Sequence, residues 1–168
     1  MGAIFGLIHW LGDPVDRDSL ERMDRALARH GPDGSGVWRE GPAGLGHRLM
    51  RFTPQDGLER QPRISADGAL VLVCDARIDN RRELAAELEA HRPSTAGPSL
   101  DDTPDSDFLL RAWEAWGPEC VRHLVGVFAF AIYYCLFRFL ILRFDIKTPG
   151  REAISPDDSQ APPPAPAS

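Results

Sequence analysis

Length, composition and charge limit the classes of protein to which this chain can belong. Its 168 residues predict one domain, and 43% hydrophobic with 26% charged side chains is typical of a soluble globular protein. The formal net charge of −6 argues against nucleic-acid binding, because phosphate recognition needs a basic face. No basic segment precedes the apolar residues 3–10, so the sequence predicts no signal peptide and a cytoplasmic location.

The cysteines and histidines do not follow the spacing of a metal site. The chain has 3 cysteines without a CxxC pair and 5 scattered histidines, none of them near a Cys or acidic residue at ligand spacing. Cys74, Cys120 and Cys135 lie in apolar or helical surroundings, so we expect buried, reduced thiols. The sequence therefore predicts neither a metal nor a cofactor in this chain.

The first part of the chain predicts three strands and one helix. The strands are expected at residues 3–10, 37–39 and 45–50, and the helix at residues 16–30. Leu20, Met23 and Leu27 fall on one face of this helix. Asp18 and Glu21 have the spacing of a capping box near its start.

The second part of the chain predicts two more helices among further strands. Strands are expected at Ile64, 69–74, 125–134 and 139–142, and helices after Asn80 and Asp105. Asn80 with Glu83 has capping-box spacing, and Asp105 is a suitable N-cap for the second helix. Runs of strands with segregated helices indicate an α+β domain with mostly antiparallel sheets.

Two segments near the C-terminus need separate interpretation. Residues 124–142 are almost long enough to span a membrane, but Arg138 lies within them and residues 125–134 equally suit a fully buried strand. We therefore predict buried strands for residues 124–142. Residues 147–168 are polar and rich in proline, so we expect a disordered tail, with the domain itself ending at residue 146.

Several short motifs, taken together, resemble the class II glutamine amidotransferase domain of asparagine synthetases. They are RHGPDGSG at residues 29–36, GHRL at 46–49, QP at 61–62, DARIDN at 75–80, Asp105 before a helix that ends in Trp116-Gly117, and GVFAFAIY at 126–133. The resemblance covers about residues 1–135. It implies an N-terminal-nucleophile hydrolase fold, an αββα sandwich of antiparallel sheets, expected here to be incomplete at the C-terminal end.

The resemblance also implies a chemistry, and this chain departs from it. In active members the residue after Met1 is a cysteine whose thiolate attacks the side-chain amide of glutamine, and the freed α-amine serves as the base. An Asn side chain and a Gly amide hold the oxyanion. Here Gly2 occupies the nucleophile position, and Asp75 and Ala76 replace the Asn and the Gly. No catalytic residue is therefore predicted.

The resemblance assigns the remaining site residues to glutamine binding. Arg48 matches the arginine that holds the ligand's carboxylate, although a surface arginine in a strand is the alternative. Asp105 matches the acid that binds the ligand's ammonium group, or it is an N-cap, or both. Asp75 and Arg77 are expected to form an ion pair. The full predicted set is Arg48, Leu49, Met50, Arg51, Phe52, Asp75, Ala76, Arg77 and Asp105.

These matches and mismatches predict a degenerate glutaminase-type domain that cannot itself hydrolyse glutamine. The parent enzyme would be asparagine-synthetase-like and would use ATP to form an amide or a lactam, in asparagine biosynthesis or in peptide or lactam cyclisation. ATP and magnesium would then belong to a synthetase domain, here a possible partner protein, because no Ser-Gly-Gly-x-Asp-Ser loop occurs in this sequence. Glutamine is a second possible partner.

Two alternative functions remain open from the sequence. The first is a non-catalytic module that binds an amino acid or a partner protein in the pocket of Arg48 and Asp105. The second is a non-functional gene fragment that does not fold alone, because residues 125–142 would expose an adhesive edge. Whether the chain is an enzyme also stays open: the family hydrolyses glutamine, whereas this chain has glycine at the nucleophile position.

Overall fold

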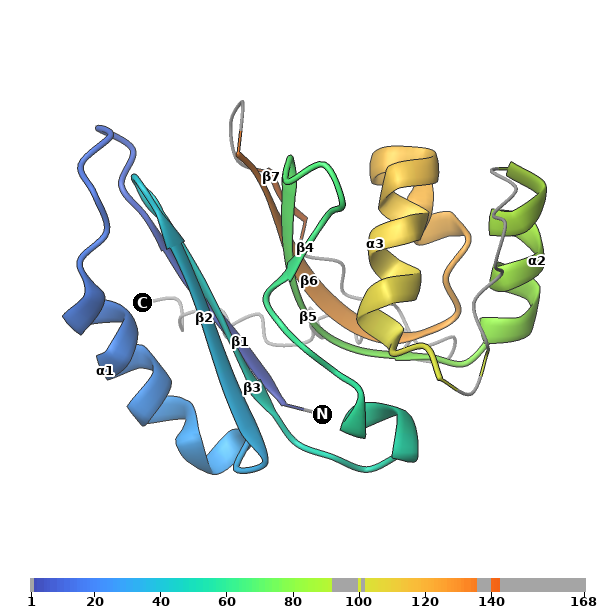
Figure 1. Ribbon diagram of the computed structural model, residues 1–168, viewed down its shortest axis with the longest axis horizontal. Coiled ribbons are helices and arrows are strands. Elements are labelled where there is room, and N and C mark those ends of the chain that lie inside the picture. The colour runs from blue at the N-terminus through green and yellow to red at the C-terminus, as the bar shows by residue number, and fades with distance from the viewer. Residues whose placement is uncertain (1, 92–99, 101, 136–139, 143–168) are drawn as a thin grey trace, which may run out of the picture.

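Two antiparallel sheets packed between helices form the domain (Figure 1). The computed structural model describes residues 2–91, 100, 102–135 and 140–142. The first sheet has the strand order β1 (Ala3–Ile8), β3 (Ala43–Leu49) and β2 (Gly34–Glu40). The second sheet has the order β4 (Arg63–Ile64), β5 (Leu70–Ile78), β6 (Gly126–Tyr134) and β7 (Leu140–Leu142).

Helices cover the outer face of each sheet. Helix α1 (Arg17–Leu27) packs on the first sheet, and α2 (Arg81–His91) and α3 (Asp105–Trp116) pack on the second (Figure 1). Short 3₁₀ turns occur at Ala28–His30, Pro54–Gly57 and Gly117–Arg122. This arrangement confirms the predicted α+β fold with an αββα layering. The predicted tail, residues 147–168, lies outside the described residues.

Strand β5 is buried on both of its faces, which explains its uninterrupted apolar sequence. Leu72 and Cys74 belong to the core that α2 and α3 complete. Val71 and Val73 point the other way and pack with Leu45 of β3 between the two sheets. Alternating side chains of one strand therefore fill two separate cores.

Strand β6 accounts for most of the apolar stretch 124–142. It pairs with β5 along its whole length, from Gly126 opposite Ile78 to Tyr134 opposite Leu70, and β7 pairs with its second half. The stretch therefore forms strands as predicted, but β6 is not fully buried: Phe128, Phe130 and Ile132 are buried, whereas Val127 is 57% exposed. Within the part of the chain that the structure describes, no helix has the length and apolar character needed to cross a membrane.

The start of α1 differs from the prediction. Asp16 is the N-cap, and its carboxylate accepts a hydrogen bond of 2.7 Å from the amide of Ser19. Asp18, the predicted capping residue, lies within the first turn, where a carboxylate still favours the positive end of the helix dipole. The predicted strand at 37–39 also begins earlier, at Gly34, because β2 pairs with β3 along its full length.

Asn80 and Asp105, the residues predicted to cap α2 and α3, also form other contacts than the predicted ones. The amide group of Asn80 donates to the carbonyl of His123 and accepts from the amide of Val125, both at 2.9 Å, and so ties the start of α2 to the segment before β6. Asp105 is the first residue of α3 rather than its N-cap, a position that Pro104 takes. Its carboxylate is therefore available for other partners.

Candidate functional site

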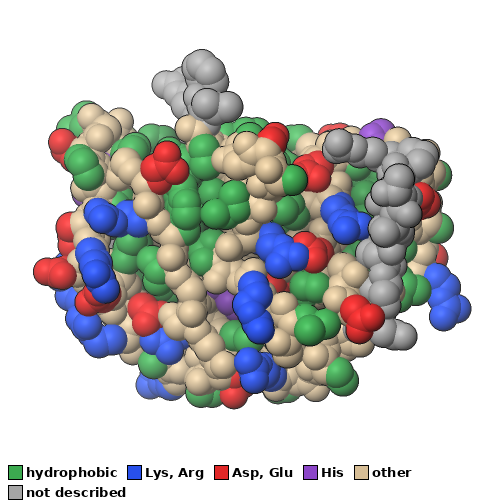
Figure 2. Space-filling model, in the orientation of Figure 1, with side chains coloured by type: hydrophobic (Ala, Val, Ile, Leu, Met, Phe, Trp, Pro, Cys, Tyr) green, Lys and Arg blue, Asp and Glu red, His purple; other side chains and the backbone are tan. Residues whose placement is uncertain are grey.

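A cavity of about 470 Å³ opens where the start of β1, the end of β3, the middle of β5 and the start of α3 meet. Figure 1 shows the N-terminal end of the chain close to this place. On the surface drawn in Figure 2, arginines and carboxylates are interspersed around hydrophobic side chains. The cavity is lined by Gly2, His47, Leu49, Met50, Phe52, Thr53, Asp56, Glu59, Gln61, Cys74, Asp75, Ala76, Arg77 and Asp105.

Gly2 lies so close to strand β3 that no side chain fits at its position. A Cβ atom placed on Gly2 would lie 2.0 Å from the carbonyl oxygen of Arg48 and 3.4 Å from the amide nitrogen of Met50. Real Cβ atoms do not come within 3.0 Å of such atoms. A cysteine here would therefore require the backbone of β1 or β3 to move.

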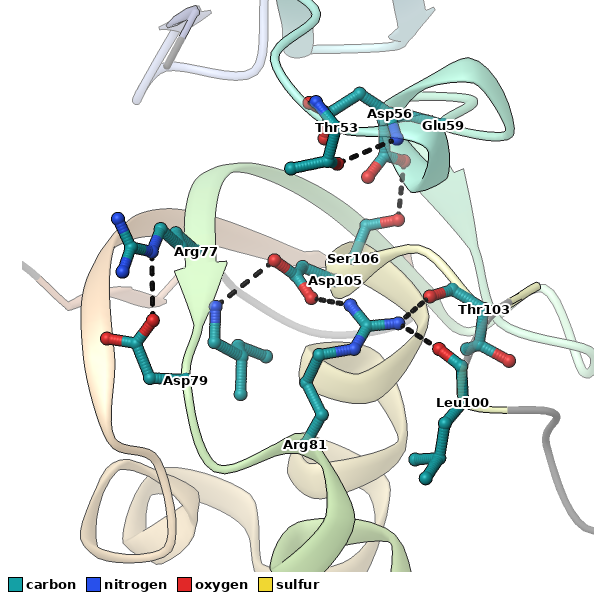
Figure 3. A network of polar contacts seen from close by, with 11 residues as sticks. Thr53, Asp56, Glu59, Arg77, Asp79, Arg81, Leu100, Thr103, Asp105 and Ser106 are labelled. Carbon is teal, nitrogen blue, oxygen red and sulfur yellow. Dashed lines mark hydrogen bonds and ion pairs between the residues drawn. The ribbon is translucent and has the colours of Figure 1, made fainter.

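Asp75 of β5 closes the same corner of the cavity. Its Oδ1 accepts a hydrogen bond of 2.7 Å from the backbone nitrogen of Gly2. The predicted ion pair between Asp75 and Arg77 is wrong, because the Arg77 guanidinium donates to Asp79 at 2.8 Å. Asp79 lies just beyond the end of β5, and both side chains of its pair with Arg77 are exposed to solvent (Figure 3).

Asp105 joins the start of α3 to the end of β5 and the start of α2 (Figure 3). Its Oδ2 accepts from the amide of Ile78 at 3.1 Å, and its Oδ1 forms a short ion pair with Arg81. Burial raises the pKa of Asp105, while the bond from Ile78 and the charge of Arg81 oppose that effect. Asp105 thus lines the cavity with a carboxylate that already has two partners.

Glu59 is a second carboxylate of the cavity, and sequence reasoning did not identify it. Its Oε1 accepts a hydrogen bond of 2.5 Å from the hydroxyl of Ser106 and another of 3.0 Å from the amide of Arg60 (Figure 3). Burial raises the pKa of Glu59. It stands two residues before the Gln61-Pro62 motif in an irregular segment, so no periodicity pointed to it.

Arg48 does not reach this cavity. Side chains alternate between the two faces of a strand, and the cavity-facing positions of β3 are His47 and Leu49. The Arg48 guanidinium instead forms a short ion pair with Asp24 of α1, on the opposite face of the first sheet. The structure therefore does not bring Arg48 and Asp105 together, and the pocket predicted between them does not exist in this arrangement.

Among the other predicted residues, Arg51 also lies outside the cavity, and the rest line it. Arg51 is exposed and is absent from the cavity wall, and its backbone amide donates to Asp33 at 2.8 Å. The predicted residues that line the cavity are Leu49, Met50, Phe52, Asp75, Ala76, Arg77 and Asp105.

Cys74 reaches the cavity wall but has the properties of a structural thiol. It is 1% exposed, and burial raises its pKa well above the ordinary value, so the thiol stays protonated at neutral pH. The side chain of Gln61 holds the backbone of Cys74 through bonds of 2.6 Å to its amide and 3.0 Å to its carbonyl. Cys120 is likewise buried, whereas Cys135 is partly exposed.

His47 should make the domain acid-sensitive. Burial lowers the pKa of His47 to about 4, against 6.5 in the unfolded chain. The unfolded chain therefore takes up this proton first, and stability is lost as pH falls from 6.5 towards 4, by about 3 kcal/mol in total. Urea unfolding at a series of pH values measures this loss.

The raised pKa values of Glu59 and Asp105 have the opposite effect on stability. The folded state binds these two protons more readily than the unfolded chain does, so both groups stabilise the fold as the pH falls. A His47→Gln variant isolates the histidine, since it retains both carboxylates but does not titrate. We expect the wild type to lose more stability than the variant between neutral pH and pH 4 (about 3 kcal/mol more). Parallel pH profiles for the two proteins would contradict a buried neutral His47.

Comparison with known proteins agrees with the motifs and the fold. A family model described as a glutamine amidotransferase domain matches residues 1–145. Glutamine-hydrolysing asparagine synthetase 3 of Bacillus subtilis is 30% identical over 120 residues, which is 70% of this chain and 19% of that protein. Asparagine synthetase B of Escherichia coli is 28% identical over 134 residues, 79% of this chain and 23% of that protein.

A solved structure supports the same fold. The chain resembles the glutamine phosphoribosylpyrophosphate amidotransferase of B. subtilis with a TM-score of 0.57 and 16% identity, over 78% of this chain and 35% of that one. The chain spans about a fifth of the length of the asparagine synthetases that it matches, namely 19% and 23% for the two above. It belongs to the family of glutamine amidotransferase domains, in the class II form that asparagine synthetases carry.

Proposed function

We propose that this domain has lost glutamine hydrolysis and acts as a non-catalytic domain of an asparagine-synthetase-like enzyme. The observation that carries the proposal is the environment of Gly2. Its position offers no side-chain nucleophile, and a Cβ there would lie 2.0 Å from the Arg48 carbonyl oxygen. A chain that could use a thiolate at this position would need a different path for β1 against β3.

The environment of Asp75 supports the same conclusion. Hydrolysis of an amide passes through a tetrahedral intermediate with a negatively charged oxygen, which needs hydrogen-bond donors. An ionised carboxylate offers only acceptors and repels a developing oxyanion. Asp75 lies 2.7 Å from the Gly2 nitrogen, so its negative charge lies next to the position where the reaction would occur.

An enzyme with such a domain would use an amine in place of ammonia from glutamine. The synthetase part would activate a carboxylate with ATP and magnesium, and the amine would come from the substrate itself, so that an amide or a lactam forms. Asparagine biosynthesis with ammonia from another source is the second possibility. In either case this domain would act by folding against a synthetase domain, either in the same chain or in a partner.

A binding module is the second candidate function, and the cavity favours it. Its volume of about 470 Å³ lies within the ordinary range for small-molecule sites. Leu49, Met50 and Phe52 form an apolar wall, and Asp75 and Asp105 supply polar groups on the side of β5 and α3. This cavity would bind a ligand without changing it.

Glutamate release from glutamine tests the proposal. The purified chain is incubated with glutamine at neutral pH, and glutamate is quantified over time against a sample without protein. We expect equal rates in the two samples. Glutamate production that depends on the amount of folded chain, and stops when the chain is unfolded, would show that the domain is a glutaminase.

A further inference from the structure

The cavity has lost its means of binding a carboxylate. Among the described residues that line it, Arg77 is the only arginine, and its side chain is 72% exposed and paired with Asp79. Strand β3 contributes Leu49 at the position that faces the cavity, while Arg48 pairs with Asp24 on the opposite face. A ligand carboxylate would therefore enter without a buried cation to neutralise it.

His47 cannot supply the missing positive charge. It is 5% exposed and points into the cavity from β3. Burial lowers its pKa to about 4, so the imidazole is neutral at physiological pH. The histidine therefore contributes a polar group but no charge.

Apart from the exposed Arg77, the charged side chains on the wall are carboxylates from three different segments. Asp56 and Glu59 come from the segment before β4, Asp75 comes from β5, and Asp105 comes from α3. The pair with Arg81 offsets the charge of Asp105. Asp75 accepts one hydrogen bond at Oδ1, and its Oδ2 forms no hydrogen bond with the described residues. Asp56 and Glu59 each accept two hydrogen bonds at one of their oxygens. Asp75 accepts one, from Gly2, and forms no ion pair with the described residues, so it is the carboxylate of the wall with the most capacity for a new cationic partner.

The apolar wall opposite these groups fits an aliphatic stem. Leu49 and Met50 follow β3 into the cavity, and Phe52, which is 69% exposed, stands at its mouth. A ligand with a short methylene chain would bury that chain against these side chains and place its charged end near Asp75. The removal of apolar surface from water would favour binding of such a chain.

We propose that this cavity binds small primary amines in their ammonium form, with the ammonium group on Asp75 and the aliphatic part along Leu49, Met50 and Phe52. The cavity rejects α-amino acids, glutamine included, because their carboxylate meets carboxylates and no free cation. This inference rests on the proposed non-hydrolysing function and specifies its ligand. In an amide-forming enzyme, the amine is the class of reactant that replaces ammonia.

A series of three related compounds tests the ligand class. 4-Aminobutanamide has the amide and the amine of glutamine but no carboxylate, 5-amino-5-oxopentanoate has the amide and the carboxylate but no amine, and glutamine has all three. Each is titrated into the full chain by isothermal calorimetry at neutral pH and constant ionic strength. We expect 4-aminobutanamide to bind at least about tenfold more tightly than either other compound, since a tenfold ratio corresponds to a single modest charge interaction.

Variants identify the residue that binds the ammonium group. Asp75→Asn can still accept the Gly2 hydrogen bond through its amide oxygen, so it retains the fold, and we expect it to weaken binding of the amine at least about tenfold. Asp18→Asn, on the exposed side of α1, makes the same charge change away from the cavity and should leave binding unchanged. Melting curves of both variants check that they are folded.

Two outcomes would overturn the inference. The first is that glutamine or 5-amino-5-oxopentanoate binds as tightly as the amine, or that none of the compounds binds. The second is that Asp75→Asn binds the amine as the wild type does. Glutamine that binds without being hydrolysed would overturn only this inference, whereas glutamate release would overturn the proposed function.

Discussion

Replacing Arg81 with Ala should destabilise the domain by about 3 kcal/mol, because it breaks a largely buried ion pair and leaves the second charge without a partner. The Arg81 side chain is 22% exposed and that of Asp105 is 18% exposed. The same guanidinium donates to the carbonyls of Leu100 and Thr103 and lies 4.8 Å from the centre of the Phe108 ring (Figure 3). One side chain therefore joins the start of α2 to the start of α3.

Urea unfolding at neutral pH measures this effect, and the neighbouring residue provides the control. Arg82 is the next residue of α2, has the same charge and is exposed. Arg82→Ala should therefore change stability by no more than about 0.5 kcal/mol. Adding Asp105→Asn to Arg81→Ala should restore part of the lost stability, because it removes the unpaired charge. Equal effects of the two arginine variants would mean that the network does not hold the helices.

Replacing Gly2 with Cys should give no glutamine hydrolysis and should lower stability by about 1–3 kcal/mol, the usual range for forcing extra atoms into a packed site. The new Cβ would lie 2.0 Å from the Arg48 carbonyl oxygen, so either β1 or β3 must shift. The shift would also disturb the hydrogen bond from Gly2 to Asp75. Glutamate release and urea unfolding are measured on the same preparation.

Two further variants separate the steric effect from the chemical one. Gly2→Ala adds the same Cβ without a thiol, so it should lose as much stability as Gly2→Cys. The triple variant, Gly2→Cys with Asp75→Asn and Ala76→Gly, removes the negative charge at the oxyanion position but should retain the steric conflict at position 2. If Gly2→Cys alone released glutamate, the explanation from Asp75 and from the lack of space would both be wrong.

Much of the fold could be predicted from hydrophobic patterns because burial determines those patterns directly. The uninterrupted apolar run 69–74 predicted a strand, and the structure has β5 there, with its apolar half buried on both faces. The helix at 105–116 followed from apolar residues at helical spacing. Helix caps were harder to predict, because the hydrogen-bond partners of a polar side chain such as Asn80 lie far away in the sequence.

The residues of the site could be predicted from the sequence only in part. Motif resemblance found half of the residues that line the cavity, but it also placed Arg48 there. A difference of one position along β3 moves a side chain to the other face of the sheet. Glu59 lies in an irregular segment, and its carboxylate accepts a hydrogen bond from Ser106 of α3, a contact that no local sequence pattern indicates. Only the three-dimensional register shows which of two neighbouring residues faces the cavity.

Covalent labelling tests most directly whether the domain has lost its nucleophile. The folded chain is incubated with a glutamine analogue that carries an electrophilic diazoketone in place of the amide, and its intact mass is measured. A glutaminase with an N-terminal cysteine serves as the positive control. We expect no adduct on this chain, because position 2 is glycine and Cys74 is a buried, protonated thiol. A stoichiometric adduct that forms only on the folded chain and is prevented by glutamine would contradict a non-hydrolysing domain.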